Sequence, residues 1–374
     1  MRVGILTSSR ADYGIYQPLL KRLSEDPFFD MSLLVFGTHL SERFGYTVRE
    51  IEKDGYDIAL RADTVPEDDT KASVVSSMAK TILEFNKLWM REKFDVIVAL
   101  GDRYEMFAAV ASSVPYNINV AHIHGGETTL GAIDNAFRHS ITHFSSLHFT
   151  SCNIYRDRVI ELTEESSNVF NAGALSMDNM RKTELFTPGE FSERFSIDIS
   201  EPFILTTFHP ETKAGERNIE YIREVVSAIK SMHGYRFLVT MPNADPMGLT
   251  VREALLELEK ETGYVKCIEN LGSKGYYTCL SHCRMMLGNS SSGFTEAIYF
   301  DKPVVNIGDR QKGRIITANI FTCRAIKKEI LEAVKKAEDY VPGTAVNIFG
   351  DGNSADFIAL KLKEYHNHKQ KADA

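Results

Sequence analysis

DVIVALGDRYEMFAAVASSVPYNINVAHIHGG, residues 95–126, contains the pattern that decides the fold. An apolar run at Asp95–Gly101 is followed by a helical pattern at Tyr104–Val114 and a second apolar run at Asn117–Gly126. Short apolar runs that end in Gly and polar turns are typical of parallel strands buried on both faces. This stretch is therefore predicted to form a strand, a helix and a second, parallel strand.

The same alternation extends in both directions along the chain. Upstream, the predicted strands are Arg2–Thr7 and Met31–Gly37, and the predicted helices are Ile15–Glu25, Ser41–Lys53 and Lys71–Arg91. Downstream of Pro202, strands are predicted at Phe203–Phe208, Tyr235–Met241, Tyr264–Glu269, Arg284–Gly288 and Pro303–Gly308, with helices at Arg217–Met232 and Thr250–Glu261. Two such blocks predict an α/β fold of two Rossmann-like, doubly wound domains that face a cleft.

A chain of 374 residues is long enough for two domains. We expect an N-terminal domain over residues 1–175 and a C-terminal domain over residues 176–352. The polar stretch Ser176–Ser200 is the predicted linker. A last helix near Ala355–Tyr365, within residues 353–366, is expected to return to the first domain.

Composition excludes several functional classes. The formal net charge of −8, from 43 basic and 51 acidic residues, argues against nucleic-acid wrapping and against a polybasic membrane patch. Neither a membrane-spanning apolar stretch nor the pattern of a signal peptide is found. The five cysteines form no CxxC pair, and we expect reduced thiols in a cytoplasmic protein.

Ligands of doubly wound sheets bind beyond the carboxyl ends of the strands, so the residues there are the candidates. After the first strand, Thr7–Gly14 offers small hydroxyl residues at the start of a helix, together with Arg10. Backbone N–H groups and a guanidinium suit a phosphate. An ordinary serine cap beside a solvated arginine is the alternative. The segment is neither GxGxxG nor a Walker loop, which disfavours NAD and ATP.

Three carboxylates follow strands of the first domain or begin its next helix. They are Asp102, Glu127 and Asp134, and Arg138 lies one turn beyond the last of them. Crowded carboxylates raise one another's pKa, so one can serve as an acid while another is a base. Helix caps could account for one or two of them. His122 and His124 invite a metal alternative, because residues two apart in a strand point the same way, but no third ligand is evident, and we predict no metal.

The second domain offers a second anion site. A serine-rich turn at Gly288–Glu296 follows a strand and begins a helix, which presents N–H groups and hydroxyls. Glu296, expected about one turn into that helix, could accept both ribose hydroxyls, and Arg310 adds a cation. Serine-rich turns also cap helices without binding any ligand. Anion sites on both domains are suited to a diphosphate that lies across a cleft.

Together these motifs resemble the UDP-N-acetylglucosamine 2-epimerases, which share the two-domain architecture of GT-B glycosyltransferases. The resemblance is greatest to the hydrolysing branch of bacterial sialic acid synthesis. It spans about residues 7–314 and rests on the following motifs in order: SSRADYG (8–14), GDRYE (101–105), HIHGGE (122–127), Asp134 to His139, FHPET (208–212), PNAD (242–245), GNSSSG (288–293) and NIGDRQKGR (306–314).

The resemblance implies roles for individual residues. The uridine diphosphate is expected to bind His209, Asn243, Ser290, Ser291, Ser292, Glu296 and Arg310, and the diphosphate or sugar is expected to approach Arg10, His39 and Arg103. The implied catalytic residues are Asp102, Asp134 and Arg138, together with Glu127 or His124. The family's further catalytic Glu falls at His124 here, so either Glu127 replaces it or His124 takes over its acid–base work.

The implied reaction converts UDP-N-acetylglucosamine and water to N-acetylmannosamine and UDP through 2-acetamidoglucal. It needs no redox cofactor, and relatives of this fold suggest a homodimer or homotetramer. One alternative substrate is UDP-2,4-diacetamido-2,4,6-trideoxyglucose, used in legionaminic acid synthesis. A glycosyltransferase of the same fold would need an acceptor site instead of three carboxylates. A nucleotide-sugar sensor would lack Asp102 and Asp134, both of which are present.

Overall fold

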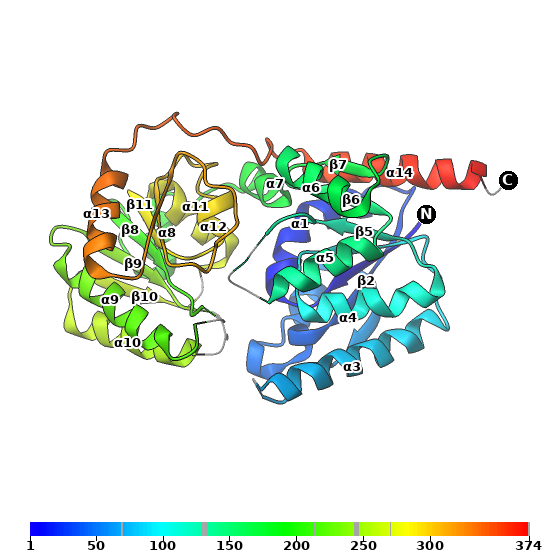
Figure 1. Cartoon of the computed structure of the whole chain (residues 1–374), viewed down its shortest axis with the longest axis horizontal. Helices are drawn as coiled ribbons and strands as arrows, with labels where there is room; N and C mark the ends of the chain where they lie inside the picture. Colours follow the sequence, from blue (N-terminus) through cyan, green and yellow to red (C-terminus); the bar gives the residue numbers. More distant parts are fainter. Residues whose placement is uncertain are drawn as a thin grey trace. The chain divides into compact units, whose positions relative to one another are not determined.

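The computed structural model describes residues 1–372, apart from 69, 129, 131–132, 212–213, 243–246 and 270. The chain forms two compact units, each built around its own sheet (Figure 1). Unit 1 comprises Met1–Glu127, Asp134–Arg181 and Ile348–Ala374, and unit 2 comprises Thr128–Ile133 and Lys182–Asn347. Among the helices of the described residues, none combines the length and apolar character needed to cross a membrane.

The sheet of unit 1 has seven parallel strands in the order β3-β2-β1-β4-β5-β6-β7. Their bounds are β1 Arg2–Thr7, β2 Asp30–Phe36, β3 Ile58–Ala62, β4 Val96–Leu100, β5 Val120–Ile123, β6 Leu147–Thr150 and β7 Val169–Asn171. The order reverses direction at β1 and β4, as in doubly wound folds. The carboxyl ends of these strands place the candidate residues of unit 1.

Helices cover both faces of this sheet because successive side chains of a strand point to opposite faces. Val3 and Ile5 of β1 pack in the core with α1 and α14, whereas Leu6 packs in the core with α3 and α4. The helices of unit 1 are α1 Arg10–Ser24, α2 Val48–Asp54, α3 Lys71–Trp89, α4 Tyr104–Ser113, α5 Asp134–Phe144, α6 Asn153–Thr163, α7 Leu175–Lys182 and α14 Ser354–Ala372. Short 3-10 turns lie at η1 Gly37–Leu40, η2 Glu42–Phe44 and η3 Val114–Tyr116.

The C-terminal helix α14 belongs to unit 1, beside α1 (Figure 1). The buried carboxylate of Asp178, on α7, accepts hydrogen bonds from the backbone N–H groups of Ser354 and Ala355, each at 3.0 Å. These donors at the first turn of α14 have no partner within the helix, so Asp178 caps it from outside. A residue distant in sequence thus fixes where the last helix begins.

The sheet of unit 2 has six parallel strands in the order β10-β9-β8-β11-β12-β13. Their bounds are β8 Phe203–Thr207, β9 Arg236–Thr240, β10 Val265–Ile268, β11 Met285–Gly288, β12 Val304–Ile307 and β13 Ile320–Cys323. Its helices are α8 Pro188–Phe195, α9 Arg217–Ser231, α10 Gly248–Glu261, α11 Gly272–His282, α12 Ser292–Thr295 and α13 Lys327–Glu338. Both units therefore have the predicted doubly wound, parallel α/β architecture.

The structure refines two local predictions. The division between the units, at Arg181 and Lys182, falls inside the predicted linker at residues 176–200, which contains helix α8 and most of α7. Thr187 and Glu190 form a reciprocal capping box that starts α8. The helix predicted at Ser41–Lys53 is interrupted, because Gly45 and Tyr46 have positive φ values of 91° and 47°. Only its second half forms the regular helix α2.

Candidate functional site

Arg138 of α5 is the centre of a buried ionic cluster in unit 1. Its guanidinium donates to Oδ2 of Asp102, which follows β4, and lies 3.5 Å from Oε2 of Glu127. It also donates to the carbonyl oxygen of His124 at 2.7 Å. Burial alone would lower the pKa of Arg138, but the charges of Asp102 and Glu127 raise it. The guanidinium thus remains cationic and holds the ends of β4 and β5 together.

Asp102 and Asp134 differ in their surroundings. Arg103, not Asp102, is the N-cap residue of α4, so Asp102 is not a helix cap. Asp134 is the first residue of α5 and is half-buried. Burial first, and then the charge of Asp102, raise the pKa of Asp134 to about 6. A carboxyl group whose pKa is raised toward neutral pH is suited to acid–base chemistry.

His124 and Glu127 lie in the turn that follows β5. The His124 ring nitrogen Nδ1 is 3.6 Å from Glu127 Oε1, and Ser151 Oγ donates to the same oxygen at 3.0 Å. His124 has a φ of 65°, which is uncommon for a residue other than glycine. A Cβ on Gly126 would lie 2.4 Å from the carbonyl oxygen of Tyr155, so only glycine fits where the turn meets α6.

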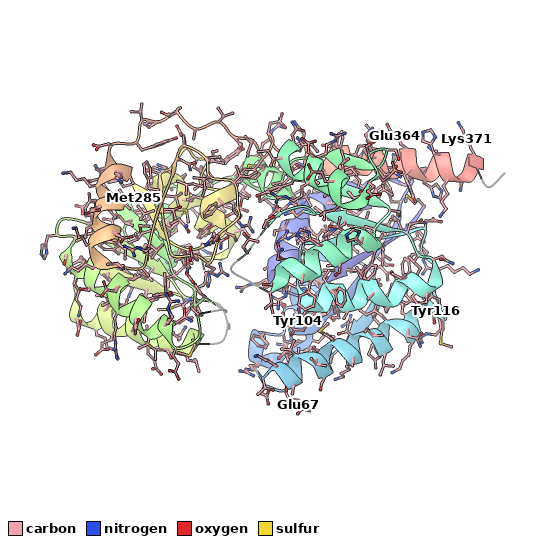
Figure 2. The ribbon with its side chains drawn as sticks, viewed as in Figure 1. Glu67, Tyr104, Tyr116, Met285, Glu364 and Lys371 are labelled. Atoms are coloured by element: carbon pink, nitrogen blue, oxygen red, sulfur yellow. The ribbon has the colours of Figure 1, made fainter. Side chains whose placement is uncertain are left out.

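Arg103, predicted to approach the substrate, forms a two-pronged ion pair with Glu105. Its Nε and Nη2 atoms donate to the two carboxylate oxygens at 3.2 and 2.8 Å. The Glu105 side chain is 1% exposed and that of Arg103 is 46% exposed. The charge of Glu105 raises the pKa of Arg103 above its ordinary value. Glu105 therefore holds one edge of the Arg103 guanidinium in place. The neighbouring residue Tyr104 is labelled in Figure 2.

The turn after β1 is organised by Asp12, which is 5% exposed. Its carboxylate accepts from the backbone N–H of Ser8 at 2.9 Å and of Ser9 at 3.1 Å, and Ser9 and Asp12 form a capping box at the start of α1. Ser9 is therefore an ordinary N-cap of α1, as the alternative interpretation of this segment predicts. Arg10, the first residue of α1, is exposed, as expected of a side chain available to a ligand.

For His39 the structure gives a different role from the predicted one. Its side chain is fully buried. Nε2 is 2.9 Å from Thr7 Oγ1, and Nδ1 is 2.7 Å from Thr47 Oγ1. Because both ring nitrogens have internal partners, direct contact with a substrate is not supported. The ring instead joins the turn after β1 to the start of α2.

The alternative of a metal site at His122 and His124 loses its basis. His122 is fully buried, with Nδ1 3.1 Å from Thr142 Oγ1 and Nε2 2.8 Å from the carbonyl oxygen of Gly101. Burial lowers the pKa of His122 to about 3, so the ring is neutral. His124 lies beyond the last residue of β5, where the strand alternation no longer applies. Within the described part of the chain, no group of three or more metal-binding side chains converges.

In unit 2, the ends of β8 and β11 are joined through His209 and Asn289. The His209 backbone N–H donates to Asn289 Oδ1 at 2.7 Å, and Asn289 Nδ2 donates to the His209 carbonyl oxygen at 2.8 Å. Burial, and then the charge of Arg310, lower the pKa of the His209 ring to about 3. Gly288 before this pair has a φ of 139°, and a Cβ there would lie 1.9 Å from the Thr207 carbonyl oxygen.

Arg310 is held in the turn after β12. Its Nη1 donates to the Asn289 carbonyl oxygen at 3.1 Å. Glu211 Oε1 accepts from the backbone N–H of Asp309 at 2.7 Å, and a Cβ on Gly308 would lie 2.2 Å from that oxygen. A half-buried guanidinium therefore lies beside the turn that contains the serines.

The serine-rich turn follows β11, the strand that begins at Met285 (Figure 2). Ser290 Oγ and Ser292 Oγ are 2.9 Å apart, and Ser291 is exposed. The helix that follows, α12, is shorter than predicted, so Glu296 is its C-cap residue instead of lying inside it. Burial raises the pKa of Glu296 to about 7. Asn243, a further predicted ligand residue, lies outside the described residues.

Sequence reasoning missed several side chains that support these residues. Some of these supporting residues are polar and adjoin a predicted site residue, which was the one signal in the sequence. The partner that each of them contacts is set by tertiary packing. They are Thr7, Asp12, Thr47, Glu105, Ser151, Glu211 and Asn289.

Known proteins resemble this chain over most of its length. A UDP-diacetylbacillosamine 2-epimerase (hydrolyzing) of Legionella pneumophila is 32% identical, covering 98% of this chain and 96% of that protein. A GDP/UDP-N,N'-diacetylbacillosamine 2-epimerase (hydrolyzing) of Campylobacter jejuni is 33% identical, covering 86% and 83%. Polysialic acid biosynthesis protein P7 of Escherichia coli is 33% identical, covering 96% and 95%.

A solved structure shares the fold. The UDP-GlcNAc 2-epimerase of Neisseria meningitidis, in a crystal structure with UDP-GlcNAc bound, matches with a TM-score of 0.82 at 17% identity, covering 97% of this chain and 100% of that one. The sequence profile described as UDP-N-acetylglucosamine 2-epimerase matches residues 21–363. The chain is a member of the UDP-N-acetylglucosamine 2-epimerase family.

Proposed function

We propose that the protein is a hydrolysing 2-epimerase, which converts a UDP-activated 2-acetamido sugar and water to the free 2-epimeric sugar and UDP. The observation that carries this proposal is the cluster at the ends of β4 and β5. Arg138 holds Asp102 and Glu127 there, and Asp134 has a pKa raised to about 6. Such a cluster can remove and deliver protons near neutral pH.

Inversion at C2 requires one group that removes a proton and another that delivers one to the opposite face. A base takes the C2 proton, the C–H electrons form the C1=C2 bond, and UDP leaves with the electrons of its bond to C1. A carboxyl group then protonates C2, water adds to C1 and that water loses a proton. We assign the protonation of C2 to Asp134, because its raised pKa leaves part of it protonated.

We assign the uridine diphosphate to unit 2. Arg310 supplies a cation, and the turn with Ser290 and Ser291 supplies hydroxyl and N–H donors. Glu296 is proposed to accept the ribose hydroxyls, and the neutral His209 to contact the nucleotide. Binding of a UDP-sugar to this fold is supported by solved structures of the same fold that contain UDP or UDP-GlcNAc.

Two substrates are candidates. UDP-N-acetylglucosamine is the first candidate, because the family profile that matches this chain is named UDP-N-acetylglucosamine 2-epimerase. UDP-N,N'-diacetylbacillosamine is the second, because two relatives at 32% and 33% identity are named for that activity. The sugars differ at C4 and C6, so the reaction at C2 is the same for both. The product of the first would be N-acetylmannosamine, a precursor of sialic acids.

The test is proton NMR in D2O with each sugar nucleotide in turn. We expect UDP and the free 2-epimer, with deuterium at C2, from one of the two substrates. Deuterium at C2 would establish proton removal and hydrolysis in one spectrum. Release of UDP with an unepimerised sugar would contradict the proposal and indicate a glycosyltransferase that lacks its acceptor. Failure to consume either sugar nucleotide would also contradict it.

A further inference from the structure

Glu127 and His124, in the turn after β5, are the two candidates for the further catalytic acid–base residue, and their side chains differ in solvent exposure. The side chain of Glu127 is 4% exposed, whereas that of His124 is 14% exposed, although its Nε2 atom is buried. The Glu127 carboxylate also has partners on three sides. Ser151 Oγ donates to Oε1, Arg138 lies 3.5 Å from Oε2, and His124 Nδ1 lies 3.6 Å from Oε1. A carboxylate enclosed in this way is suited to hold neighbours instead of meeting a substrate.

Hydrogen bonds of its backbone fix the position of His124. Its N–H donates to the Phe149 carbonyl oxygen of β6 at 2.9 Å, and its carbonyl oxygen accepts from Arg138 at 2.7 Å. The φ of 65° costs about 1 kcal/mol for a residue with a Cβ, and such strain persists only where the surroundings impose it. Gly126 packs so closely against α6 that a Cβ there would lie 2.4 Å from the Tyr155 carbonyl oxygen, which restricts the path of the turn.

We propose that His124 is the catalytic group that takes the C2 proton and that Glu127 is a positioning residue that acts through it. This inference rests on the proposed 2-epimerase function. A carboxylate facing Nδ1 favours the tautomer with its proton on that nitrogen, which leaves the lone pair on Nε2. At 3.6 Å the two groups are near each other without forming a hydrogen bond, and contacts in active sites often tighten only in the complex with substrate.

The proton balance is complete without another reagent. Nε2 takes the C2 proton as C1=C2 forms and the bond between C1 and the UDP oxygen breaks. The imidazolium is stabilised by the Glu127 carboxylate and releases its proton to solvent after the glycal is hydrated. The proton delivered to C2 comes from Asp134, which regains one from solvent. Water contributes the hydroxyl at C1.

The test uses the full-length protein and His124→Gly. Glycine suits a φ of 65°, so the fold is expected to be retained, and the missing ring leaves space for added imidazole. The variant is expected to lower kcat by about 10² to 10⁴ with little change in KM. Imidazole at millimolar concentration is expected to restore at least about a tenth of the lost rate, as a base in place of the ring. His282→Ala, at an exposed histidine of unit 2, is the control that should neither lose activity nor respond to imidazole.

A double-mutant cycle tests the role of Glu127. Glu127→Gln alone is expected to lower kcat by roughly 10 to 10³, but to have no further effect in the His124→Gly background, because it acts through the absent ring. Losses that multiply in the double variant would show that Glu127 acts on the substrate itself and would overturn the assignment. If His124→Gly fails to fold, His124→Asn is the substitute, since asparagine tolerates the same φ.

The outcomes separate this inference from the proposed function. Wild-type turnover combined with a fully active His124→Gly variant overturns the role of His124 alone. The role of His124 is also overturned if His124→Gly loses turnover and imidazole restores it in neither His124→Gly nor His124→Asn. Wild-type protein that releases no 2-epimer from either sugar nucleotide overturns the proposed function, and the role of His124 with it.

Discussion

Asn289 and His209 exchange two hydrogen bonds, at 2.7 and 2.8 Å, between the turns that follow β11 and β8. Asn289 is fully buried, and its side-chain amide satisfies both the N–H and the C=O of the His209 main chain. Buried polar groups that lose their partners are destabilising. This pair therefore fixes the relative positions of the turns of unit 2 to which we assign the nucleotide.

Asn289→Ala is expected to lower the free energy of unfolding by about 2 to 4 kcal/mol, because a buried N–H and a buried C=O lose their partners. Urea unfolding followed by circular dichroism measures it. Asn306→Ala is the control, since Asn306 is also buried but makes only a 3.4 Å bond to Thr322, and its change should be smaller. Equal losses in the two variants would contradict the role given to Asn289.

Asp102→Asn is expected to lower kcat by roughly 10² to 10⁴ while UDP affinity stays unchanged, because Asp102 belongs to unit 1 and to the acid–base cluster. Single-turnover kinetics and calorimetric titration with UDP measure the two effects. Asp95→Asn, just before the first residue of β4, is the control and should leave both unchanged. A normal rate in Asp102→Asn would remove Asp102 from the catalytic groups.

Asp134→Asn is expected to stabilise the protein above pH 6 while it abolishes turnover. The folded-state pKa of Asp134 is raised from 3.8 to about 6, so the native state binds more protons than the unfolded state between these values. Stability of the wild type therefore falls as pH rises through this window, by at most about 2 to 3 kcal/mol. Asparagine, which does not ionise, avoids that loss.

Unfolding midpoints of wild type and Asp134→Asn across pH 3 to 8 measure this effect, with the expected window set by the pKa of Asp134. The two curves should coincide below about pH 4 and separate as pH rises. A constant difference over the whole range would mean that the Asp134 pKa is not raised in the native state.

Glu296→Ala is expected to weaken UDP binding by about 1 to 3 kcal/mol, because a charged hydrogen bond to the ribose is lost. The pKa of Glu296 is raised to about 7, and the ionised form is the better acceptor. Uridine, which has no phosphate to titrate, should therefore bind the wild type more tightly at pH 8 than at pH 6. Glu193→Ala, at an exposed position of α8, is the control. Unchanged UDP affinity in Glu296→Ala would exclude Glu296 from the nucleotide site.

The sequence alone determined the two parallel sheets and the strand ends at which the candidate residues lie. Burial on both faces leaves a continuous apolar run in a strand, and this run is a local property that can be read without the fold. Four strands were missed. Partly exposed positions weakened the signal of β3 and β13, whereas β6 and β7 are only four and three residues long. Asp102 and Arg310 were chosen as candidates because each follows a strand, and Arg138 because it lies one turn after Asp134, the first residue of α5.

Only the tertiary structure decided what each of these side chains does. His39 and Arg10 were both predicted to bind the substrate, yet His39 is buried between two threonines whereas Arg10 is exposed. Glu127 is enclosed by Arg138 of α5 and by Ser151, which follows β6. Burial and partner choice depend on which segments meet in space, and residue type or spacing does not specify them.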